Sequence, residues 1–172
     1  MPGCCKECGC TSNCNGEPEK KEIVIDFLYL DLSVCERCQG TENNLDEAID
    51  EASNILKAAG YDIKLNKINI ISKDLAMKYE FMSSPTIRVN GNDIAFELKE
   101  SACKECGDLC GSSVECRVWN YEGKDYNYAP KELIINAILK EVYSNNDISH
   151  KKEEYKLPQN LEVFFEGSSK LK

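Results

Sequence analysis

The sequence predicts an α/β fold with a four-stranded mixed sheet flanked by helices, and three neighbouring segments carry that prediction. Residues 23–32 form an almost continuous apolar run, which is typical of a buried strand. Apolar residues then recur at helical spacing from Leu45 until Gly60 ends the pattern. Residues 61–71 alternate as a second strand, so the three segments predict a right-handed βαβ unit with parallel strands.

The rest of the chain supplies the remaining strands and helices. Asn90-Gly91 favours a tight hairpin turn between two short strands. Pro130 suits the start of a final amphipathic helix. The expected elements after residue 71 are a helix over 73–81, strands over 86–89 and 93–97, and a helix over 131–143.

Composition limits the classes of protein to which the chain can belong. Its 172 residues suffice for one domain with a real core and extensions. The 30 acidic residues exceed the 21 basic ones, and no basic stripe is present to bind nucleic acid. The start lacks the apolar core of a secretion signal, and no window approaches the length of a membrane span. We therefore expect no nucleic-acid partner, no membrane association and a cytoplasmic location.

The composition also divides the chain into parts. Residues 1–20 have no apolar cluster to bury, so we expect a flexible cysteine-rich arm. Residues 21–144 form the predicted domain, which carries a cysteine-rich insertion over residues 99–119. Residues 145–172 begin as a charged linker and end in an apolar tail, which we expect to dock on the domain or on a partner.

Eleven cysteines are many for a chain without a secretion signal. Their number is odd, and the middle of the chain has enough apolar residues to fold without a disulfide framework. In a reducing compartment, clustered cysteines more often bind metal or carry out redox chemistry. The one histidine, His150, is far in sequence from every cysteine cluster, so any metal site is expected to be all-sulfur.

A CxxC pair, Cys35 and Cys38, lies where the first strand meets the long helix. The partial positive charge of a helix N-terminus favours thiolate and lowers a cysteine pKa. Two intervening residues also allow the pair to cycle between dithiol and disulfide. Thr41 and Asn44 are N-cap candidates as well, however, and a helix starting there would leave Cys38 on a turn.

The insertion contains four more cysteines, which could form a second sulfur site. A CxxC followed by two further cysteines can wrap one tetrahedral zinc ion. The candidate ligands are Cys103, Cys106, Cys110 and Cys116. Two alternatives are that Cys103 and Cys106 form a second redox pair or face the first one, and that these thiols are inert. Because the insertion has few apolar residues, we expect zinc or disulfides to hold it.

The N-terminal arm carries five thiols within 11 residues. Zinc, Cu(I), Hg(II) and trivalent arsenic all favour thiolate ligands, and a flexible arm can wrap an ion. The alternative is a tail with no defined role. The arm cysteines are Cys4, Cys5, Cys8, Cys10 and Cys14.

The order of strand, CxxC, helix, strand, short helix, Ser-Pro-Thr-Ile strand and hairpin resembles the thioredoxin-like superfamily. That resemblance implies that Cys35 is the exposed nucleophile, that Cys38 resolves the mixed disulfide, and that Pro85 is the cis-proline beside them. The CxRCxxT motif that begins at Cys35, the Cys116-Arg117-x-Trp119 motif and the tail over 158–165 also resemble a thioredoxin-like family of unknown function. This second resemblance implies a fold and no substrate.

Three function hypotheses follow. The first is a thiol-disulfide oxidoreductase, requiring no cofactor, that acts on a protein or small-molecule disulfide through Cys35 and Cys38. The second is a thiol-rich protein that binds or passes on a soft metal or metalloid. The third is a non-catalytic interaction domain with a vestigial CxxC. The Glu-Arg dipeptide and Val34 before the first cysteine depart from thioredoxin, while Asp31 is a candidate proton acceptor for Cys38.

Overall fold

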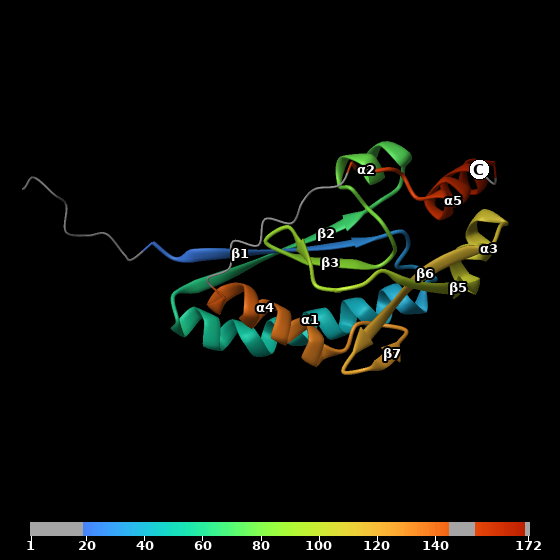
Figure 1. Ribbon diagram of the computed structural model, residues 1–172. Helices are drawn as coiled ribbons and strands as arrows, with labels where there is room; N and C mark the ends of the chain where they lie inside the picture. The colour runs from blue at the N-terminus through green and yellow to red at the C-terminus, as the bar shows by residue number, and fades with distance from the viewer. Residues whose placement is uncertain (1–18, 145–153, 171–172) are drawn as a thin grey trace, which may run out of the picture.

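The apolar run near the start of the chain forms β1 (Lys21–Tyr29), the strand around which the computed structural model is built (Figure 1). The structure describes residues 19–144 and 154–170. Side chains of β1 alternate between two cores, because successive residues of a strand point to opposite faces. Ile25 and Phe27 enter the core under one face, and Leu28 enters the core under the other.

The predicted four-stranded mixed sheet is confirmed, with strand order β2-β1-β3-β4. The central strand β1 pairs in parallel with β2 and antiparallel with β3, and β3 pairs antiparallel with β4. The other strands of this sheet are β2 (Tyr61–Asn69), β3 (Thr86–Val89) and β4 (Asn92–Asp93).

Helices cover both faces of the sheet (Figure 1). The long α1 (Glu36–Ala58) and α4 (Lys131–Tyr143) pack together beneath one face and enclose the larger core. The short α2 (Lys73–Lys78) lies over the opposite face near α5 (Gln159–Lys170). The bounds predicted for the helix over 131–143 are confirmed.

The insertion folds into regular elements. Its strands β5 (Lys99–Cys103) and β6 (Val114–Tyr121) pair antiparallel, and α3 (Lys104–Cys110) connects them. A hairpin at Gly123 then leads from β6 into β7 (Lys124–Tyr126), which completes a second, three-stranded sheet. Thus the segment between the main sheet and α4 forms a small unit beside the start of α1 (Figure 1).

The C-terminal helix α5 covers this unit. Leu161, Phe164 and Phe165 are buried in the same core as the cysteines of the insertion. Gly167 permits close contact, since a Cβ atom there would lie 2.1 Å from the backbone oxygen of Cys110. The apolar surface that the insertion lacks is therefore supplied by the tail.

Helix α1 begins before Thr41 and Asn44, the two alternative N-cap candidates in the sequence. Cys35 is its N-cap, and the Cys35 Sγ accepts a hydrogen bond of 3.4 Å from the Cys38 backbone nitrogen. Thr41 and Asn44 lie inside the helix. Their side chains bond to the backbone of Ala129 instead of capping α1.

The strand expected over 93–97 is mostly absent, since β4 ends at Asp93. The Asp93 carboxylate accepts two hydrogen bonds of 2.9 Å from Arg117 and one of 2.9 Å from the Ala95 backbone nitrogen. These bonds turn the chain away from the sheet towards β5. A long-range ion pair thus replaces the expected local pairing.

The mixed sheet and its helices are compatible with a thioredoxin-like fold. The Ser84-Pro85 peptide bond is cis, as predicted. In the part of the chain that the structure describes, no helix is both long and apolar enough to cross a bilayer.

Candidate metal centre

Four cysteine sulfurs gather where the end of β1, the start of α1 and the insertion meet. Their Sγ atoms all lie within 4.8 Å of one another, and all four residues are buried. The Sγ atoms of Cys106 and Cys116 are 3.5 Å apart. We call this set the four-sulfur group. Its members are Cys35, Cys103, Cys106 and Cys116.

Three segments of the chain place these sulfurs. Cys35 comes from the N-cap of α1, where the backbone amides of the first turn face the thiol. Cys103 ends β5 and Cys106 lies in the first turn of α3, so these two neighbouring ligands are three positions apart in the chain. Cys116 lies on β6 opposite Ser101, which puts it diagonally beside Cys103 on the same face of the ribbon.

Arg37, inside the CxxC, ties α1 to the insertion. One terminal nitrogen donates hydrogen bonds of 3.2 and 3.1 Å to the backbone oxygens of Ser101 and Cys116. The other donates bonds of 2.9 and 3.1 Å to the Ser101 hydroxyl and the Ala102 backbone oxygen. Among the described residues no carboxylate forms an ion pair with this guanidinium, and its four hydrogen bonds all go to the insertion.

Cys38 lies beside the four-sulfur group without belonging to it. Its Sγ is 3.3 Å from the Ser84 hydroxyl oxygen, which also accepts a 3.1 Å bond from the Leu30 backbone nitrogen. The loop that holds Ser84 is tied to β6 by a 2.7 Å bond from the Arg117 backbone nitrogen to the Ser84 backbone oxygen. Ser84 thus fixes Cys38 against the cis-proline loop.

The thiols divide into two classes by pKa. Thiol hydrogen bonds, the strongest from Cys103, hold the pKa of Cys35 far below its ordinary value, although burial acts in the opposite direction. The pKa of Cys103 is lowered too, first by Cys106 and then by Cys116. Hydrogen bonding to Cys103 raises the pKa of Cys106 and of Cys116. Cys38 donates to Cys35 and is buried, and both effects raise its pKa. The thiolate form, which binds metal, is therefore favoured most at Cys35.

The observed group differs from the predicted zinc site at one position. Cys110 is buried, but its thiol donates to the backbone oxygens of Gly107 and Ser112, and Cys35 takes its place in the group. The interpretation in which Cys103 and Cys106 face the first CxxC describes the arrangement better. All six described cysteines are free thiols, and the five arm cysteines lie outside the described residues.

Two expectations about the CxxC itself need correction. Cys35 was expected to be exposed, yet both it and Cys38 are fully buried, because the insertion and α5 cover them. The Asp31 carboxylate was a candidate proton acceptor for Cys38. It instead accepts hydrogen bonds from Ser33 and Val34 within its own turn.

The size of the four-sulfur group suits a single tetrahedral ion. Four sulfurs placed about 2.3 Å from a central zinc lie about 3.8 Å from one another. The upper limit of 4.8 Å in this structure needs only a small contraction to reach that arrangement. A [4Fe–4S] cluster needs more widely spaced thiolates, because each one binds a different iron.

Comparison with protein-family models gives one result. A model described as a domain of unknown function, DUF2703, matches residues 23–138. The chain belongs to the DUF2703 family. The matched range includes the whole four-sulfur group and Cys38, whereas α5 lies beyond it. Searches of curated proteins and of solved structures find no match to this DUF2703 chain.

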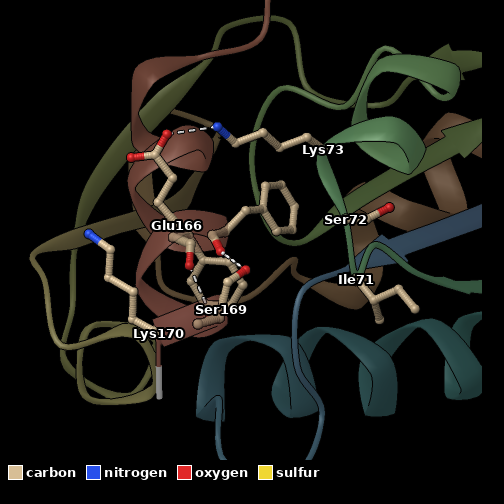
Figure 2. Close-up of a pocket in the computed structure, with 9 residues that line it drawn as sticks. Ile71, Ser72, Lys73, Glu166, Ser169 and Lys170 are labelled. Atoms are coloured by element: carbon tan, nitrogen blue, oxygen red, sulfur yellow. Dashed lines mark hydrogen bonds and ion pairs between the residues drawn. The ribbon is translucent and has the colours of Figure 1, made fainter. Parts of the chain in front are cut away.

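The DUF2703 chain also has a hollow of about 410 Å³ between α5 and the start of α2 (Figure 2). Its polar groups other than Lys170 already have partners: the Lys73 ammonium lies 2.8 Å from the Glu166 carboxylate, and the Ser169 hydroxyl donates to its own helix. The Ser72 hydroxyl caps α2. No unpaired polar side chains converge there among the described residues, so the four-sulfur group is the stronger candidate site.

Sequence analysis missed the residues that assemble the DUF2703 centre. Arg37 entered only as part of the dipeptide within the CxxC, and Ser84 only as the residue before Pro85. Arg117 was noted in a motif, yet its buried guanidinium bonds to Asp93 and Thr86 and fixes the strand that carries Cys116. The available signal in the sequence was an arginine next to a cysteine in each motif: Arg37 beside Cys38, and Arg117 beside Cys116.

Proposed function

We propose that this domain binds one thiophilic metal ion of the zinc type through the four-sulfur group. The observation that carries the proposal is the mutual approach of four buried cysteine sulfurs within 4.8 Å. A tetrahedral all-sulfur donor set is typical of zinc, and four protein ligands leave no open position for a substrate. The bound ion would join the start of α1 to the β5–α3–β6 unit and stabilise both.

The charge balance supports this proposal. The pKa values of Cys35 and Cys103 both lie below the ordinary thiol value, which favours the thiolate form that binds metal, and the Arg37 guanidinium bonds to the backbone oxygen of a third member of the group, Cys116. Binding releases the remaining thiol protons, so metal affinity falls with decreasing pH. A reducing compartment such as the cytoplasm keeps these thiols available.

The test is a zinc titration that excludes the arm. In an arm-serine protein, all five arm cysteines are replaced by serine in the full chain: Cys4→Ser, Cys5→Ser, Cys8→Ser, Cys10→Ser and Cys14→Ser. Reduced, metal-free protein is titrated with zinc against a chromophoric chelator. We expect about one equivalent to bind tightly, as in structural zinc sites.

Cys35→Ser and Cys110→Ser, made in the arm-serine protein, form a matched pair. Both residues are buried cysteines, but only Cys35 belongs to the four-sulfur group. We expect Cys35→Ser to lose tight binding and Cys110→Ser to retain it. The proposal fails if the arm-serine protein binds no zinc, or if the two variants bind it equally.

Thiol-disulfide exchange by Cys35 and Cys38 is the second candidate function. It is favoured by the position of Cys38 between the Cys35 thiol and the loop that contains Pro85. Cys35 would attack a protein or small-molecule disulfide and Cys38 would resolve the adduct. Because Cys35 serves in both functions, metal binding and thiol exchange compete for one sulfur.

A further inference from the structure

Cys38 supplies a fifth sulfur in contact with one member of the four-sulfur group. Its thiol hydrogen bonds to Cys35, and its backbone nitrogen donates a 3.4 Å bond to the same sulfur. The other described cysteine outside the group, Cys110, bonds to backbone oxygens instead. In a metal-loaded centre, Cys38 would therefore remain a free thiol next to a ligand.

We infer that the metal-loaded centre reduces low-molecular-weight disulfides with Cys35 and Cys38, and that the Cys35–Cys38 disulfide formed releases the ion. This inference rests on the metal binding proposed above. It assigns a substrate class and a means of release to that same site. The consequence is an activity in which disulfide reduction and metal delivery occur together.

The chemistry balances with two cysteines and one disulfide. The Cys35 sulfur leaves the metal and attacks one sulfur of the disulfide RSSR, whose S–S bond breaks to give a mixed disulfide and RS⁻. The Cys38 thiol gives its proton to RS⁻ and attacks the Cys35 sulfur, which expels a second RS⁻. Two electrons pass from the protein to RSSR, and the products are the Cys35–Cys38 disulfide, RSH and RS⁻.

The position of Cys35 explains why its loss would release the ion. The other three ligands come from the β5–α3–β6 unit, and Cys35 alone comes from α1. Its oxidation leaves three sulfurs on one side of the ion and opens the centre at the boundary that Arg37 spans. Three thiolates no longer form the closed four-ligand site that zinc favours.

Burial restricts the size of the disulfide. Cys35 is 0% exposed, and the most exposed member of the group, Cys103, is only 4% exposed. A folded protein disulfide would need much of the insertion and α5 to move before reaching Cys35. A small disulfide needs only a local opening, so the structure favours low-molecular-weight substrates.

The experiment uses the zinc-loaded arm-serine protein and one equivalent of 4,4′-dithiodipyridine, a small neutral disulfide that forms a coloured thiol product. Zinc release is followed with a metal indicator, and the new protein disulfide is located by peptide mass mapping. We expect about one zinc released per disulfide reduced, with Cys35 joined to Cys38. If the mapped disulfides involve only Cys103, Cys106 and Cys116, the inference is overturned by the arm-serine protein alone.

Cys38→Ser and Cys110→Ser, made in the same background, test the role of the fifth sulfur. Both should retain zinc, because neither residue is a proposed ligand. We expect Cys38→Ser to stop at the Cys35 mixed disulfide and to release about one coloured thiol per zinc lost, whereas Cys110→Ser forms the Cys35–Cys38 disulfide and releases about two. Equal thiol yields in the two variants would overturn the inference while leaving metal binding intact. Failure of the arm-serine protein to bind zinc would instead overturn the proposed function.

Discussion

Replacing Arg37 with methionine removes the side chain that joins α1 to β5 and β6 while keeping much of its apolar length. The structure gives four hydrogen bonds of 2.9 to 3.2 Å from this guanidinium, three of them in a part-buried setting. A hydrogen bond to a charged group contributes about 1.5–3 kcal/mol, and bonds from one side chain are not additive. We expect Arg37→Met to lower the free energy of unfolding by about 2–4 kcal/mol.

The same substitution should weaken zinc binding by about tenfold, or roughly 1.4 kcal/mol, because the ion must then bring Cys35 and the insertion together unaided. Arg37→Lys keeps the charge but cannot reach all four acceptors, so we expect an intermediate effect. Arg88→Met is the matched control, since Arg88 also donates to backbone oxygens, those of Tyr79 and Glu80, away from the sulfurs.

Urea unfolding measures the stability of each arginine variant, and chelator competition measures its zinc affinity. We expect Arg37→Met and Arg88→Met both to lose stability, but only Arg37→Met to lose zinc affinity. If Arg37→Met binds zinc as tightly as Arg88→Met does, Arg37 does not position the metal ligands and the argument is wrong.

Three further predictions follow from individual contacts. Gly167→Ala places a Cβ atom against the Cys110 backbone oxygen, so we expect about 1–3 kcal/mol of destabilisation and faster hydrogen exchange in α3 and α5; unchanged exchange would contradict the close approach. Ser84→Ala leaves the buried Leu30 amide without its acceptor, so we expect the free energy of unfolding to fall by about 1–3 kcal/mol and the zinc stoichiometry to stay the same. A loss of bound zinc would instead show that Ser84 belongs to the metal site. When a chelator removes the ion from the zinc-loaded protein, hydrogen exchange should become faster in α3 while β1 and β2 stay protected. Equally faster exchange in all three elements would indicate that the ion holds the whole fold.

Local pattern was enough to predict most of the fold. The apolar run of β1, the helical spacing of α1 and the Asn90-Gly91 turn each depend on neighbouring residues, and the corresponding elements are present. The short β4 was not predictable in this way. Its end is set by the ion pair between Asp93 and Arg117, whose partners lie on different sheets.

The candidate site was predicted only in part for a similar reason. Spacing within the insertion selected Cys103, Cys106 and Cys116 correctly as neighbours, and it added Cys110 because that residue is close in sequence. The structure brings in Cys35 from the start of α1 instead. That choice depends on how the insertion packs beside α1, which Arg37 and the cover provided by α5 determine.

X-ray absorption at the zinc edge reports the atoms bound to the ion, so it shows directly whether the four-sulfur group holds zinc. The sample is the arm-serine protein loaded with one equivalent of zinc. We expect four sulfur neighbours at about 2.3 Å and no nitrogen or oxygen ligand. In Cys35→Ser one of the four sulfurs should be lost. Oxygen or nitrogen ligands in the parent protein, or four sulfurs that persist in Cys35→Ser, would contradict zinc binding by the four-sulfur group.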